Sequence, residues 1–160
     1  MVTLEAEISK KEKENILQNE LKERIIELHF NDAKDMVGQA LKEGMELDFK
    51  KAFQEAFKEV VLEFNFNNAK KIAEGAELDF WKELQNIFDI EFKNGHIGIA
   101  KKIEDYALGE QMPIKIKPEI LQQAKKSLID ELKTASNKGD FDYVDKITEY
   151  AKADKIDLWK

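Results

Sequence analysis

The sequence contains no cysteine and only two histidines among its 160 residues. Without cysteine there is no disulfide framework, no thiol nucleophile and no cysteine-based zinc site; this is typical of a reducing compartment, and we expect a cytoplasmic location. His29 and His96 each lie beside an expected turn, and neither has a glutamate three residues before it, as a di-metal site in a helical bundle would require. The glycine-rich phosphate-binding motifs are also missing. We therefore expect no catalytic residue, no metal and no cofactor.

Long apolar runs and chain breakers are scarce as well. No run approaches the roughly 7 to 15 apolar residues of a signal-peptide core or the roughly 18 of a membrane span, so we expect neither secretion nor membrane association. With only 2 prolines and 7 glycines, the chain has few interruptions, which favours long helices joined by short turns.

Acidic residues outnumber basic ones, 33 to 26, and give a formal net charge of -7. Nonspecific affinity for nucleic acid depends on lysine and arginine neutralising phosphates, so this balance disfavours binding to a duplex. Hydrophobic residues make up 42% of the sequence, which is sufficient for a packed core.

Four segments of the chain open with an apolar residue followed by glutamine, at intervals of 36, 31 and 37 residues: Gln18, Gln54, Gln85 and Gln122. Intervals of this length are typical of tandem helical hairpins. Apolar residues then recur at helical steps, which places them on one face of a first helix. They are Leu17, Leu21, Ile25 and Leu28 in the first segment and Phe53, Phe57, Val61 and Phe64 in the second.

A second helix is indicated in each segment. Residues 30–36 (FNDAKDM) resemble residues 66–72 (FNNAKKI), and shorter matches begin at Ala100 and Val144. We place tight turns just before or at these matches, with Asn31 and Asn67 in left-handed or capping conformations and glycine closing the helices before the later two.

The boundaries between hairpins also repeat. Residues 44–49 (GMELDF) recur as residues 75–80 (GAELDF), which predicts Asp48 and Asp79 as N-caps of the following helices. The third boundary is longer, and Pro118 is suited to the first turn of the helix that follows it.

These patterns predict helices near 9–29, 31–43, 48–64, 67–75, 79–93, 95–109, 118–137 and 140–153, and no strand. We expect an all-α fold of four αα-hairpin repeats, stacked as a short right-handed solenoid, in one domain over residues 1–160. Its units would span about 9–47, 48–78, 79–116 and 117–154, with a C-terminal stub at 155–160.

The pattern resembles the α-helical tandem-repeat, or αα-hairpin, superfamily over residues 17–160. Residues 94–103 (NGHIGIAKKI) look like the second-helix entry of an ankyrin repeat. The order of elements around residues 44–49 and 75–80 is similar to that of pentatricopeptide units. The ankyrin Thr-Pro-Leu-His opening and the tetratricopeptide Trp and Leu-Gly signature are absent, so the resemblance implies an architecture and transfers no functional residues.

Two sets of matched residues are candidates for binding a partner. In a stacked array, equivalent glutamine amides fall in a row, where they hydrogen-bond along the stack or offer donors and acceptors to a partner. Matched tryptophans pack between repeats or, where exposed, anchor an interface. The candidates are Gln18, Gln54, Gln85, Gln122, Trp81 and Trp159.

We expect a noncatalytic protein–protein interaction or scaffold module that binds another protein or a peptide. One alternative is a small acidic inhibitor or decoy of a nucleic-acid enzyme, which the net charge favours. Another is a helical repeat that binds single-stranded RNA through the matched glutamines. RNA binding is disfavoured because none of the four units has a net positive charge.

The last five residues (IDLWK) copy the lead of an earlier unit, residues 77–81 (ELDFW). Leu158 and Trp159 are not the polar residues that normally close a repeat array. We therefore expect this end to fold back over the final hairpin or to form a homodimer interface.

Overall fold

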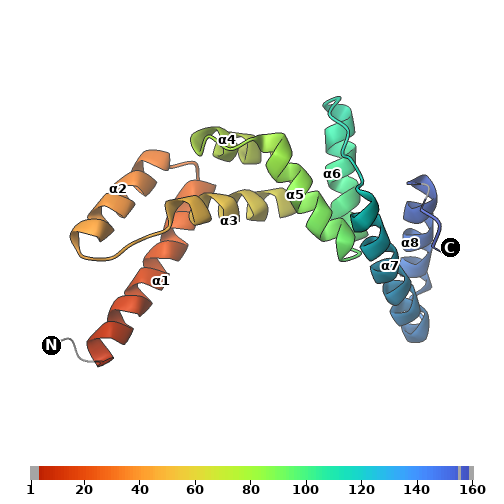
Figure 1. The fold of residues 1–160 in the computed structure, drawn as a ribbon, viewed down its shortest axis with the longest axis horizontal. Coiled ribbons are helices and arrows are strands. Elements are labelled where there is room, and N and C mark those ends of the chain that lie inside the picture. Colours follow the sequence, from red (N-terminus) through yellow and green to blue (C-terminus); the bar gives the residue numbers. More distant parts are fainter. Residues whose placement is uncertain (1–3, 155, 159–160) are drawn as a thin grey trace. The chain divides into compact units, whose positions relative to one another are not determined.

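The computed structural model describes residues 4–154 and 156–158, with residues 4–8 as backbone only (Figure 1). These residues form eight α-helices and no strand, which confirms the all-α prediction. The first helix begins at Leu4, not near residue 9, and the other boundaries lie within three residues of those expected. The helices are α1 (Leu4–Ile26), α2 (Phe30–Lys42), α3 (Phe49–Leu62), α4 (Phe66–Gly75), α5 (Phe80–Lys93), α6 (Ile97–Gly109), α7 (Pro118–Lys138) and α8 (Phe141–Ala153).

The chain divides into two compact units, Met1–Phe80 and Trp81–Lys160, with the division one residue into α5. In the first unit α1 packs against α2 and α3, and α3 packs against α4; in the second, α8 packs against α7 and α6. The single domain and the four unit boundaries expected from the sequence stay predictions.

The turns inside the hairpins share one backbone conformation. Each contains a residue with positive φ: Leu28 (65°), Phe64 (63°), Gly95 (78°) and Gly139 (74°). The N–H of the next residue bonds to a carbonyl five residues back, as in His29 to Arg24 at 2.9 Å. This pairing is the Schellman motif, which satisfies the last carbonyls of a helix while ending it.

The placement of the first two of these turns from the sequence was wrong. Asn31 and Asn67 lie inside α2 and α4, and the left-handed residues are Leu28 and Phe64. The Schellman motif places the left-handed residue directly after the C-cap of the helix that ends. The asparagine that acts as an N-cap is Asn65, whose side chain accepts from the N–H of Asn68 at 3.3 Å.

The connections between hairpins begin with the same motif. Gly44, Glu77 and Gln111 have positive φ, and in each case the next residue is apolar and bonds back to an alanine carbonyl. These bonds are Met45 to Ala40, Leu78 to Ala73 and Met112 to Ala107. The capping predictions hold at Asp48, which accepts from the N–H of Lys51 at 2.9 Å, and at Pro118, which opens α7.

Aromatic side chains fill much of the core of the first unit. Phe53 is 2% exposed and contacts the rings of Phe30 and Phe49, with centroids 5.7 and 4.8 Å away. Phe57 is 1% exposed and meets Phe80 edge to face at 5.8 Å. Gly75 leaves room for this packing, because a Cβ there would lie 2.8 Å from the ring of Phe30 and the ring would have to shift.

The core of the second unit is built from all four of its helices. The largest fully buried side chains are Leu84, Phe88, Phe92, Ile103, Leu128 and Ile147. The α5–α6 turn is fixed to α7 because the Ser127 hydroxyl donates to the carbonyl of Lys93 at 2.7 Å.

None of the helices in the described part of the chain is both long and apolar enough to cross a lipid bilayer.

Candidate functional site

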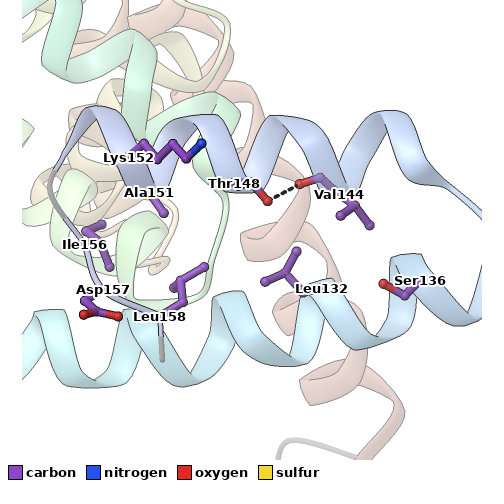
Figure 2. A pocket seen from close by; sticks show the side chains of 9 residues that line it. All are labelled: Leu132, Ser136, Val144, Thr148, Ala151, Lys152, Ile156, Asp157 and Leu158. Carbon is purple, nitrogen blue, oxygen red and sulfur yellow. Dashed lines mark hydrogen bonds between the residues drawn. The ribbon is translucent and has the colours of Figure 1, made fainter. Parts of the chain in front are cut away.

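An apolar groove lies between α7 and α8 in the second unit, with a volume of about 500 Å³ (Figure 2). Leu132 of α7 and Leu158 of the C-terminal segment point into the space between the two helices. The lining residues are Leu132, Ser136, Val144, Thr148, Ala151, Lys152, Ile156, Asp157 and Leu158.

The C-terminal segment closes one end of this groove. The N–H of Ile156 bonds to the carbonyl of Ala151 at 2.7 Å, the same return that Met45, Leu78 and Met112 make after their helices. Ile156 and Leu158 are 7% and 8% exposed. The described part of the stub therefore folds back on the last hairpin, which was one of the two arrangements expected from the sequence. Trp159 lies outside the described residues.

The polar groups of the groove are few and in part already engaged. The Thr148 hydroxyl donates to the carbonyl of Val144 at 2.9 Å, and Lys152 is exposed. A site of this composition recognises an apolar surface by shape and desolvation rather than by a set of hydrogen bonds.

Two of the four matched glutamines hold connections of their own unit. The Gln18 side chain donates to the carbonyl of Asp48 at 2.8 Å and accepts from its N–H at 3.0 Å. Gln85 makes the same pair of bonds to Lys115, at 2.8 and 3.1 Å. Each amide thus clamps the backbone thirty residues further along the chain.

The other glutamine and tryptophan candidates have different surroundings. Gln54 and Gln122 are exposed. Trp81 is half-buried and stacks on Tyr106, with centroids 6.0 Å apart and 22° between the ring planes. Trp159 lies outside the described residues. The role of the six candidates in binding a partner stays a prediction.

Buried charged groups were missed by the sequence analysis. Asp89, 8% exposed, accepts from Gln85 at 2.8 Å and from the Lys117 ammonium at 3.0 Å, which anchors the start of α7. Glu91, 7% exposed, is bonded to Nδ1 of His96 at 2.5 Å. A buried carboxylate requires a partner. These two pairs supply one at the start of α7 and at the α5–α6 turn.

A carboxyl group on α6 has an altered pKa. Tyr150 is 6% exposed, and its hydroxyl donates to Glu104 at 2.6 Å. Burial, together with the nearby carboxyls of Asp154 and Asp105, raises the pKa of Glu104 to about 7, although the Tyr150 bond opposes the rise. Burial and the hydrogen-bonded carboxylate of Glu104 raise the pKa of Tyr150 far above its usual value.

We expect Glu104→Gln to stabilise the protein at pH 8 by about 1 to 2 kcal/mol, a reduced value because solvent screens this part-exposed group. A carboxyl group with a raised pKa binds more protons in the folded state than in the unfolded state. The contribution of Glu104 to the free energy of unfolding is therefore complete below about pH 4.5 and is lost as the pH rises through about 7. Urea unfolding of both proteins between pH 4.5 and 8 measures this, with the exposed Glu149→Gln as control. A constant difference across that range would contradict the prediction.

No group of three or more potential metal ligands is assembled among the described side chains. Comparison of the chain with protein-family models, with curated proteins and with solved structures finds no match.

Proposed function

We propose that the chain is a noncatalytic protein-binding module of four helical hairpins, stacked as a short right-handed solenoid, which accepts an amphipathic helix of a partner protein in the α7–α8 groove. The observation that carries the proposal is the apolar groove beside the buried Ile156 and Leu158. A partner helix is the favoured occupant because the first unit contains the same kind of contact within one chain.

That internal example is α3 on α1. The apolar face of α3 is covered by α1 together with α4, and Phe53, Phe57 and Val61 are each 2% exposed or less. The Gln18 clamp on Asp48 fixes the start of α3, and the Lys22 ammonium of α1 pairs with Glu59 of α3 at 3.0 Å. The first helix of a hairpin in this protein is therefore covered by an amphipathic helix, and burial of such a helix is a general mode of peptide recognition.

The last hairpin offers corresponding features. Its C-terminal segment returns like the connection that leads into α3, because the Ile156 bond to Ala151 repeats the Met45 bond to Ala40. Gln122 corresponds to Gln18 in the sequence pattern and is exposed on α7. A partner segment that enters the groove can thus gain apolar contact from Leu132 and Leu158 and a backbone clamp from Gln122.

A synthetic peptide that copies residues 48–62 is the direct probe, because it reproduces the helix that covers α1. We expect it to crosslink to a full-length chain that carries a photoreactive amino acid in place of Lys152, which lines the groove. The same photoreactive residue in place of Glu149, which is exposed on α8 outside the groove, is the matched control.

A peptide with aspartate at the position that copies Phe57 should lose most of the crosslinking, since it lacks the central apolar anchor. Equal crosslinking at positions 149 and 152, or equal crosslinking by both peptides, would refute the groove as the binding site.

A further inference from the structure

A second groove lies in the first unit, between α1 and α2, and has a volume of about 490 Å³. Its floor is apolar and comes from both helices: Leu17 and Met36 are half-buried, and Ala40 is 2% exposed. Leu17 and Met36 each leave part of an apolar side chain open to the groove, where a partner residue can cover it.

The rim of this groove is strongly acidic. It carries four carboxylates and a single guanidinium, that of Arg24. The acidic residues are Glu20, Asp32, Asp35 and Glu43. Asp32 has a structural role at its position, because the helix dipole stabilises a negative charge in the first turn of α2.

Glu43 accepts a hydrogen bond from the Gln39 side chain at 3.4 Å. Glu20 and Asp35 are the other two acids of the rim. Glu20 and Asp35 are exposed and lie outside the first turns of their helices. Like charges gathered on one rim repel one another, and a cationic ligand that neutralises them relieves this cost.

The charge changes sign along the hairpin. A neighbouring hollow of about 410 Å³, which shares Glu43 with the groove, is lined by Lys10 and Lys13 near the start of α1. A helix lying along both would meet acidic residues at one end and basic residues at the other. This asymmetry favours one direction of binding over the reverse.

We propose that the α1–α2 groove binds a cationic amphipathic helix of a partner protein. The apolar residues of that helix, three and four positions apart, cover Leu17 and Met36, and its lysines or arginines face Glu20 and Asp35. This surface goes beyond the α7–α8 groove of the proposed function and belongs to the other unit, so either can fail without the other.

The test uses the full chain and a synthetic leucine/lysine peptide of about 18 residues with helical spacing of its leucines. The chain has only 4 methionines, so labelling their methyl groups for NMR gives a simple map. We expect the Met36 methyl resonance to shift on titration, while that of Met112, which is 45% exposed in the other unit, stays in place. A leucine/glutamate peptide of the same pattern should bind at least about tenfold more weakly.

Charge reversal locates the binding energy. The double variant Glu20→Lys/Asp35→Lys should weaken binding of the cationic peptide at least about tenfold. Glu46→Lys/Glu74→Lys changes two exposed acids of the same unit outside the groove, so it has the same net charge and should weaken binding less than about threefold.

Circular dichroism is used to test whether both double variants fold. If Glu20→Lys/Asp35→Lys does not fold, Glu20→Gln/Asp35→Asn takes its place. Equal losses in the two double variants would show attraction to overall charge only and would overturn the proposal. A shift of Met112 as large as that of Met36, or no binding of the peptide, would overturn it as well.

Discussion

Phe57→Ala is expected to lower the free energy of unfolding by about 3 to 5 kcal/mol. Phe57 lies in the middle of the apolar face of α3, is 1% exposed, and contacts Phe80 edge to face. Removing the ring forfeits the burial of a large apolar surface and leaves a cavity that close-packed neighbours fill only in part. A loss of this size is a large share of the stability of a small unit.

Phe141→Ala is the matched control, because Phe141 is 66% exposed at the start of α8. It should cost less than about 1 kcal/mol, since little surface is removed from water at that position. Urea unfolding monitored by circular dichroism measures both variants. A loss below about 1 kcal/mol for Phe57→Ala would mean that the α3 face does not form the core in solution.

The helices could be predicted because their physical causes are local. The four-residue spacing of Leu21 and Ile25, or of Phe53, Phe57 and Val61, requires no knowledge of distant residues, and all five are buried. Leu28 and Phe64 continue the apolar pattern three residues after Ile25 and Val61, but both lie beyond the ends of their helices. They occupy the left-handed position of a Schellman turn, which a count of apolar positions does not distinguish from another helical turn.

The glutamines show what a repeat pattern leaves undetermined. The sequence aligns all four, yet within the part of the chain that the structure describes the clamps are made by Gln18 and Gln85, at Asp48 and Lys115. Whether an amide finds such a partner depends on the course of a connection thirty residues away. Gln54 precedes a shorter connection and is exposed.

The candidate sites depend on contacts between elements and were not predictable as sites. The α1–α2 groove joins Leu17 and Glu20 to Asp35 and Met36 across a hairpin, and these residues follow ordinary amphipathic patterns when each helix is considered alone. The raised pKa of Glu104 likewise follows from burial and from the nearby carboxyl of Asp154, which no spacing rule reveals.

A chain that ends at Asp154 is expected to lose about 1 to 3 kcal/mol of stability with no change in its molecular mass in solution beyond that of the deleted residues. Ile156 and Leu158 are buried against the last hairpin, and covering two aliphatic side chains contributes several kcal/mol before the entropy of ordering the segment is subtracted. The full-length double variant Ile156→Asp/Leu158→Asp should lose a similar amount, because a charged residue cannot remain at either buried position. Lys152→Ala, on the exposed edge of the same groove, should change stability by less than about 0.5 kcal/mol.

Light scattering coupled to size-exclusion chromatography distinguishes a cap from an interface between copies. Loss of stability at constant oligomeric state means that the segment caps its own hairpin, whereas a halved mass after truncation means that it joins two chains. If neither stability nor mass changes, the burial of Ile156 and Leu158 contributes nothing in solution. The groove that they line would then be open at both ends, and a partner helix would bind the truncated chain as tightly as the full one.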